Sequence, residues 1–95
     1  MIKLDNNHLL MIEPRKDKAM EPINDNLADK MIILLYRAKK QYPTRGFHQC
    51  ICGAISDNCE HVLPNGIITN SLAAHYLQWH RDEIPQSEID KLLKI

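Results

Sequence analysis

The chain has 95 residues, of which 44% are hydrophobic and 25% charged, proportions typical of one small globular domain. Twelve basic and twelve acidic side chains cancel, which argues against a highly basic nucleic-acid-binding protein but leaves a local basic patch open. Asp5 and Glu13 interrupt the N-terminal apolar run, so we expect neither a signal peptide nor a membrane span, and a cytoplasmic location.

The N-terminal segment, residues 1–24, predicts one short strand followed by a loop. The strand falls at 8–12, and His8 within this apolar run is interpreted as structural. Residues 13–22 have prolines at both ends with charges between them, a composition typical of an ordered loop or linker.

The clearest helix is predicted over 25–42. Asp25 or Asn26 can cap its start, and Pro43 stops it. Its apolar side chains fall on one face at helical spacing, which predicts core packing. These residues are Leu27, Met31, Leu34, Leu35 and Ala38.

Three short strands are predicted in the second half of the chain, at 47–51, at 61–63 and at 67–69. The turn Pro64-Asn65-Gly66 separates the last two, and Asn-Gly between apolar runs is a strong hairpin signal.

Two helices are predicted after the hairpin. Asn70 or Ser71 can cap the first, over 71–84, and Ser87 can cap the second, within 86–95. The predicted fold is therefore α+β: a small single domain with a long N-terminal helix, a short antiparallel sheet and a closing C-terminal helix.

Cysteines and histidines occur in an order that suits a zinc ion, which prefers thiolate and imidazole donors in a tetrahedron. Cys50 and Cys52 end a predicted strand, where alternate residues project to the same side. Gly53 lets the backbone turn and leaves its amide free to approach a thiolate. With His75 and His80 after the hairpin, these cysteines make four candidate ligands for one zinc ion.

The spacing of the two histidines constrains the helix on which they lie. Five positions correspond to roughly 140° around a regular helix, which would splay His75 and His80 apart. We therefore predict that the helix tightens or distorts near Trp79 and His80.

A second group of possible ligands, Cys59 and His61, precedes the hairpin. Either could replace one of the four ligands, or both could bind a second ion with His48. Asp57-Asn58 is typical of a turn, however, and we expect Cys59 to be a packed or half-exposed thiol and His61 a sheet-surface residue.

The order of cysteines, hairpin and then Leu72, His75 and His80 resembles a C2H2 zinc finger over residues 47–82. This resemblance implies a ββα unit with a buried leucine three positions before the first histidine. The chain departs from that family in its C-x-C spacing and in the 22 residues between Cys52 and His75. The stretch from CICGAISDN to TNSLAAHYLQWHRDE is also similar to small uncharacterised bacterial proteins, which implies no known activity.

Four side chains would fill a tetrahedral site, which leaves no position for water or substrate and indicates a structural, non-catalytic zinc. The chain has no glycine-rich phosphate loop, nucleophile elbow or H-E-x-x-H helix. Cys59 beside His61 lacks a third group to orient a thiol–base pair. A ββα-metal nuclease would need an open cleft that competes with the closed site. We therefore expect no enzyme.

The expected partner is another protein, which predicts an exposed apolar or aromatic patch. Counting back from His75, as in a C2H2 finger, puts Ile68, Ser71 and Ala74 at the base-reading positions, and none suits sequence-specific DNA recognition. The alternative is non-sequence-specific nucleic-acid binding, which predicts one basic face. Its residues would be Arg37, Lys39, Lys40, Arg45 and Arg81.

Overall fold

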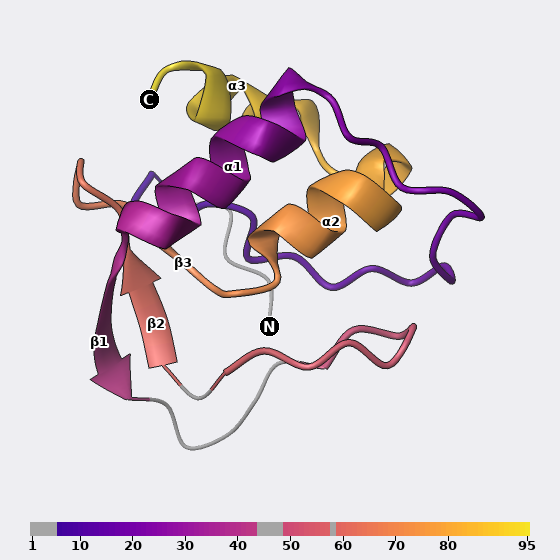
Figure 1. Cartoon of the computed structure of the whole chain (residues 1–95), viewed down its shortest axis with the longest axis horizontal. Coiled ribbons are helices and arrows are strands. Elements are labelled where there is room, and N and C mark those ends of the chain that lie inside the picture. The colour runs from indigo at the N-terminus through magenta and orange to yellow at the C-terminus, as the bar shows by residue number, and fades with distance from the viewer. Residues whose placement is uncertain (1–5, 44–48, 58) are drawn as a thin grey trace.

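A computed structural model, which describes residues 6–43, 49–57 and 59–95, confirms the α+β fold (Figure 1). Within this part of the chain no helix is long and apolar enough to cross a membrane. The elements in chain order are α1 (Asn26–Arg37), β1 (Lys39–Pro43), β2 (Cys59–Val62), β3 (Ile68–Thr69), α2 (Ala73–Trp79), the 3-10 turn η1 (Arg81–Glu83) and α3 (Gln86–Leu93).

Helix α1 begins where the sequence predicts but ends five residues earlier than the predicted range of 25–42. Asp25 is the N-cap, and its Oδ1 accepts a hydrogen bond from the Ala28 amide at 3.1 Å. Ala38 is extended, with φ −70° and ψ 153°, and the chain continues as β1. The prediction failed here because pairing with β2 satisfies the backbone of Lys39–Pro43 and outweighs its local helix preference.

The sheet is antiparallel, in the order β1-β2-β3. The predicted hairpin between β2 and β3 is confirmed: the Leu63 amide donates to the Ile67 carbonyl at 2.8 Å, and Gly66 turns the chain with φ +89°. The predicted strand at 8–12 is wrong in extent, because within it only the separate residues His8 and Met11 form bridges, and that of His8 is parallel with Ile68.

The core lies between the three helices and the N-terminal segment, and α1 packs against both α2 and α3 (Figure 1). Its principal buried side chains are Leu9, Leu10, Ile12, Ala28, Met31, Leu34, Cys50, Leu63, Leu72, Ala73, Tyr76, Leu77, Ile84 and Leu92. The presence of Cys50 in this list places the candidate metal centre against the core.

Helix α3 differs from its prediction at the cap, and its most deeply buried face includes a charged residue. Pro85, not Ser87, is the N-cap residue. Leu92 is buried, but Leu93 is largely exposed, and the fully buried residue is Glu88. Glu88 accepts a hydrogen bond from the Leu10 amide at 2.9 Å and pairs with Lys91, so its burial is compensated by partners from two segments.

Candidate metal centre

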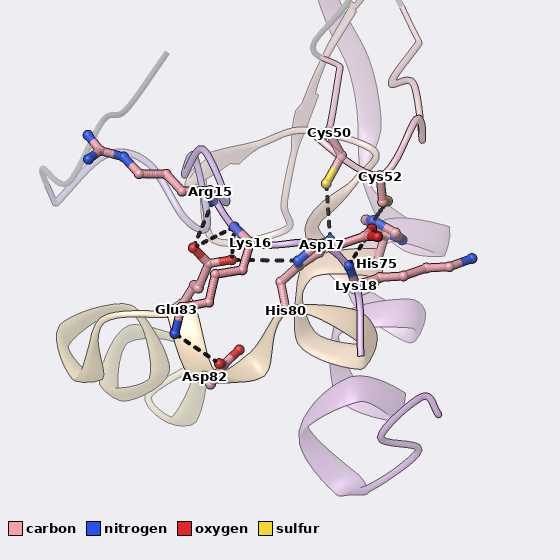
Figure 2. A network of polar contacts seen from close by, with 10 residues as sticks. All are labelled: Arg15, Lys16, Asp17, Lys18, Cys50, Cys52, His75, His80, Asp82 and Glu83. Atoms are coloured by element: carbon pink, nitrogen blue, oxygen red, sulfur yellow. Dashed lines mark hydrogen bonds and ion pairs between the residues drawn. The ribbon is translucent and has the colours of Figure 1, made fainter. Parts of the chain in front are cut away.

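The four predicted ligands come together from two segments far apart in the sequence. The Cys50 Sγ lies 3.1 Å from the His80 Nε2, and the Cys52 Sγ lies 3.2 Å from the His75 Nε2 (Figure 2). One donor atom from each of the four residues lies within 4.8 Å of the others. Sulfur and nitrogen on one tetrahedral zinc would be about 3.6 Å apart, so this cluster could hold a metal ion.

The two cysteines converge through a tight turn rather than the predicted strand. Gln49 bridges Ile55, and within the loop the Cys50 amide donates to the Ala54 carbonyl at 2.7 Å. Gly53, with φ +98°, donates its amide to the Cys50 carbonyl at 2.9 Å. The prediction that this amide faces a thiolate is therefore wrong. The start of the predicted strand, 47–48, lies outside the described residues.

The Cys50 sulfur is instead approached by two other backbone amides, those of Ile51 and Cys52. Burial raises the pKa of the Cys50 thiol, while hydrogen bonds from these two amides oppose the rise. A thiolate at this buried position therefore needs a compensating cation, which a bound metal ion would supply.

The helix that holds the two histidines is interrupted as the spacing predicts. Helix α2 ends at Trp79, and His80 has φ −132° and ψ 34°, outside the helical region. The chain then continues as η1. This break brings the His80 ring back toward His75, with ring centroids 5.1 Å apart, where a regular helix would separate them.

The residues before α2 tie the helix start to the cysteine loop, although not as simple caps. The Asn70 Oδ1 accepts from the Leu72 amide at 2.8 Å, and the Ser71 hydroxyl accepts from the Asp57 amide at 3.0 Å. Leu72, Tyr76 and Leu77 are buried, as expected for the core side of this helix, whereas Trp79 is partly exposed.

The histidines are held in an environment that suits metal binding. Burial lowers the pKa of His75, and charge on His80 and Lys18 lowers it further, which favours the neutral imidazole that binds metals. Burial and the nearby Cys50 raise the pKa of Tyr76 to about 12, so its phenol stays neutral beside the cluster.

Glu83 is a supporting residue that the sequence reasoning missed. Its Oε2 lies 3.7 Å from the His80 Nδ1, and its Oε1 accepts from the Arg15 amide at 2.7 Å (Figure 2). A carboxylate behind a ligating imidazole orients the ring and raises its basicity. The signal available in the sequence was the H-x-x-E spacing, which places Glu83 one 3-10 turn after His80.

The competing residues Cys59 and His61 lie in a separate group with Asp57. His61 was predicted to lie on the sheet surface but is only 5% exposed, because its Nε2 contacts the Asp57 Oδ2 at 2.8 Å. Cys59 is partly exposed, in agreement with its prediction. His48, the other candidate, lies outside the described residues.

Comparison of the chain with protein-family models, with curated proteins and with solved structures found no match.

Proposed function

We propose that this chain is a zinc-stabilised protein-interaction module in which Cys50, Cys52, His75 and His80 bind one structural zinc ion. The donor set supports zinc over Mg²⁺ or Ca²⁺, because those ions prefer oxygen ligands. Four protein donors leave no coordination position for substrate, which supports a structural role and no enzymatic activity. The C2H2-like arrangement of a hairpin followed by a helix is consistent with this role.

The observation that supports protein binding is the apolar outer face of α1. Tyr36 is 91% exposed, and Ile32 and Ile33 are 44% and 52% exposed. Clustered exposed apolar side chains of this size are typical of interaction surfaces. Ile33 also lines a groove of about 510 Å³, whose other lining residues are Asn26, Asp29, Lys30, Leu34, Arg37, Pro64 and Ile95.

The charges along this groove indicate the chemistry of the partner. Lys30 and Arg37 line it with one acidic residue, Asp29, and Lys39 lines the adjoining hollow of about 350 Å³. Helix α1 offers about 17 Å of length, roughly three helical turns. We infer that the partner is an apolar segment flanked by acidic residues.

The alternative of nucleic-acid binding has weaker support. Arg81 donates two hydrogen bonds to Asp25 at the start of α1, whereas Arg37 lies at the other end of that helix. Lys40 lies 3.6 Å from the Asp57 carboxylate. Arg45 lies outside the described residues, and Arg81 and Lys40 are each engaged by a carboxylate.

Zinc analysis after dialysis without added metal tests the centre. Wild-type protein and a Cys59→Ser variant should each retain one zinc ion per chain, whereas Cys52→Ser and His80→Ala should lose it. If Cys52→Ser and His80→Ala keep both the zinc and the fold, or if Cys59→Ser alone loses the metal, the ligand assignment is wrong.

Selection from a displayed peptide library tests the interaction surface. Peptides that combine apolar and acidic residues should bind the zinc-loaded protein. Ile33→Glu should abolish this binding, because the new carboxylate would be buried against apolar side chains of the peptide and would repel its acidic residues. Ile55→Glu is the matched control, since Ile55 is similarly exposed, at 59% against 52% for Ile33, but lies in the loop that contains Cys50 and Cys52. Equal loss in both variants, or the absence of any selected peptide, would contradict the proposal. A mixed-sequence oligonucleotide that binds with steep salt dependence would favour the alternative.

A further inference from the structure

A second group of metal-ligating side chains lies at the start of β2. Cys59 and His61 are alternate residues of β2 and so project to the same side, and Asp57 lies two positions before the strand. One donor atom from each residue lies within 4.8 Å of the other two. The group shares no residue with the centre formed by Cys50, Cys52 and the two α2 histidines.

The imidazole in this group is buried but only partly satisfied. The His61 Nε2 contacts the Asp57 Oδ2 at 2.8 Å. Its Nδ1 is buried, and no hydrogen-bond partner for it is found among the described residues. A buried polar atom without a partner costs free energy. The contact with Asp57 alone therefore does not account for the burial of the His61 imidazole.

The chemistry of the three donors matches a borderline-soft divalent cation. A carboxylate, a thiolate and a neutral imidazole are all zinc ligands, and together they would place two negative charges on the ion. Partial burial and the Asp57 carboxylate raise the pKa of Cys59, so its thiol keeps its proton until a metal displaces it to solvent.

We propose that Asp57, Cys59 and His61 form a second zinc site with three protein donors and one coordination position open to water. It differs in kind from the four-donor centre, because an open position allows exchange and binding of a further small ligand. This site goes beyond the proposed interaction function and does not depend on it.

Lys40 should lower the metal affinity of this site. It faces His61 across the β1–β2 pairing, and its Nζ lies 3.6 Å from the Asp57 Oδ2. A cation at that position competes with a metal ion for the carboxylate, although the lysine side chain is 67% exposed and can move into solvent. The second zinc should therefore bind more weakly than the first and should require zinc in solution.

The experiment is a titration of the full chain with Zn²⁺ and with Co²⁺, followed by native mass spectrometry and by the cobalt–thiolate absorption band. Wild-type protein should bind two equivalents, and Cys59→Ser only one, with the spectrum of the first equivalent unchanged. Glu60→Gln is the matched control, because Glu60 is the acidic neighbour on the opposite side of β2 and should leave two equivalents.

Replacement of Lys40 should have the opposite effect to replacement of Cys59. Lys40→Gln should tighten binding of the second equivalent about fivefold, without altering the first. Circular dichroism checks that every variant keeps the wild-type fold. The proposal is overturned if wild-type protein binds only one equivalent and Cys59→Ser keeps it, if Cys59→Ser still binds two, or if Lys40→Gln weakens the second equivalent or leaves it unchanged.

Discussion

Gly53 has a backbone conformation that other residues rarely adopt, with φ +98° at the turn between Cys52 and Ala54. A side chain there would meet no atom within 4 Å, so the obstacle to substitution is the backbone itself. Gly66 has a similar φ of +89° in the hairpin and also has open space around it. Replacement of either glycine would therefore impose the same kind of backbone strain, in loops with different roles.

We predict that Gly53→Ala and Gly66→Ala each lower the free energy of unfolding by about 1–2 kcal/mol through backbone strain. Only Gly53→Ala should also weaken zinc binding, because relaxation of its turn moves Cys50 and Cys52 apart. Competition with a chromogenic chelator measures the affinity, and urea denaturation measures the stability. Equal affinities in the two variants would contradict a role for this turn in placing the thiolates.

Glu83 lies behind the His80 imidazole, 3.7 Å from its Nδ1, and also accepts from the Arg15 and Lys16 amides. Glu83→Gln keeps the size of the side chain but removes the charge that orients the ring. We expect zinc affinity to fall about tenfold, which is the smaller end of the 10- to 100-fold range typical when a residue that hydrogen-bonds to a metal ligand is lost. Asp82→Asn is the control, since Asp82 is an exposed neighbour that pairs with Lys16 at 3.7 Å. An equal loss in both variants would indicate only a general effect of negative charge.

At the scale of elements, the start of α1 and the end of α2 are joined by one ion pair. Arg81 donates to both carboxylate oxygens of Asp25 at 2.8 and 2.9 Å, and to the Leu77 carbonyl at 3.0 Å. The hydrogen bonds from Arg81, and then that from the Ala28 amide, lower the pKa of Asp25 to about 2. Asp25 therefore caps α1 through the Ala28 amide and, through Arg81 in η1, joins α1 to the segment that follows α2.

This pairing predicts a pH-dependent contribution to stability. A carboxylate whose pKa is lower in the folded state stabilises the fold above its unfolded pKa of about 4, and this contribution is lost as the pH falls toward 2. Since the Asp25 side chain is 43% exposed, screening limits the contribution to about 1 kcal/mol. Asp25→Asn, which keeps a cap, should lower stability by that amount at pH 7 and by less at pH 4.

Urea denaturation of wild-type protein and Asp25→Asn in parallel tests this difference, because acid effects on the candidate metal centre are common to both and cancel between them. The same substitution made together with Arg81→Gln should cost little at any pH, since its partner is already absent. A cost that is constant from pH 7 to pH 4, or that persists without Arg81, would contradict the assignment.

The elements also show which parts of the fold can be predicted from sequence. The hairpin at 64–66, the cap of α1 and the distortion at His80 follow from local chemistry: Asn-Gly, an aspartate before an apolar stripe, and a histidine spacing that a regular helix cannot accommodate. Strand β1 could not be predicted, because the sequence Lys39–Gln41 favours a helix until β2 lies beside it.

The same distinction applies at the candidate sites. The clustering of Cys50, Cys52, His75 and His80 could be predicted from residue type and order, but the turn that brings the two cysteines together depends on hydrogen bonds within the loop. His61 could not be predicted as buried, because its burial depends on Asp57, whose position is determined by a hydrogen bond from its amide to Ser71. Tertiary partners, rather than local preference, decide both cases.

For the whole molecule, the candidate centre is continuous with a small core. Cys50 is 3% exposed and His80 is 1% exposed, and Cys50 packs among core residues that include Leu72 and Tyr76. A chain of 95 residues buries a modest fraction of its surface, so a bound metal would supply a large share of its net stability. Without the metal, two thiols and two imidazoles would remain clustered where water cannot solvate them fully.

We therefore predict that removal of zinc with a strong chelator destabilises the whole fold and not the cysteine loop alone. At a free zinc concentration 1,000 times the Kd, the ion contributes about 4 kcal/mol, which is a large part of the stability of a domain this small. Trp79, the one tryptophan, lies beside His80 at the end of α2 and under the Lys18 ammonium, 5.0 Å from its ring. Its fluorescence should shift to longer wavelength as α2 loosens, together with loss of far-ultraviolet helical signal.

Whether the Trp79 fluorescence shift and the loss of helical signal occur together decides whether the metal stabilises the whole fold or only a loop. Added Zn²⁺ should restore both, whereas Mg²⁺ should not, because Mg²⁺ prefers oxygen donors. If the metal-free chain keeps its helical signal and its denaturation midpoint while Trp79 alone responds, the centre stabilises only the end of α2. In that case the apolar face of α1 would not depend on zinc, and peptide binding to Ile33 would persist after chelation.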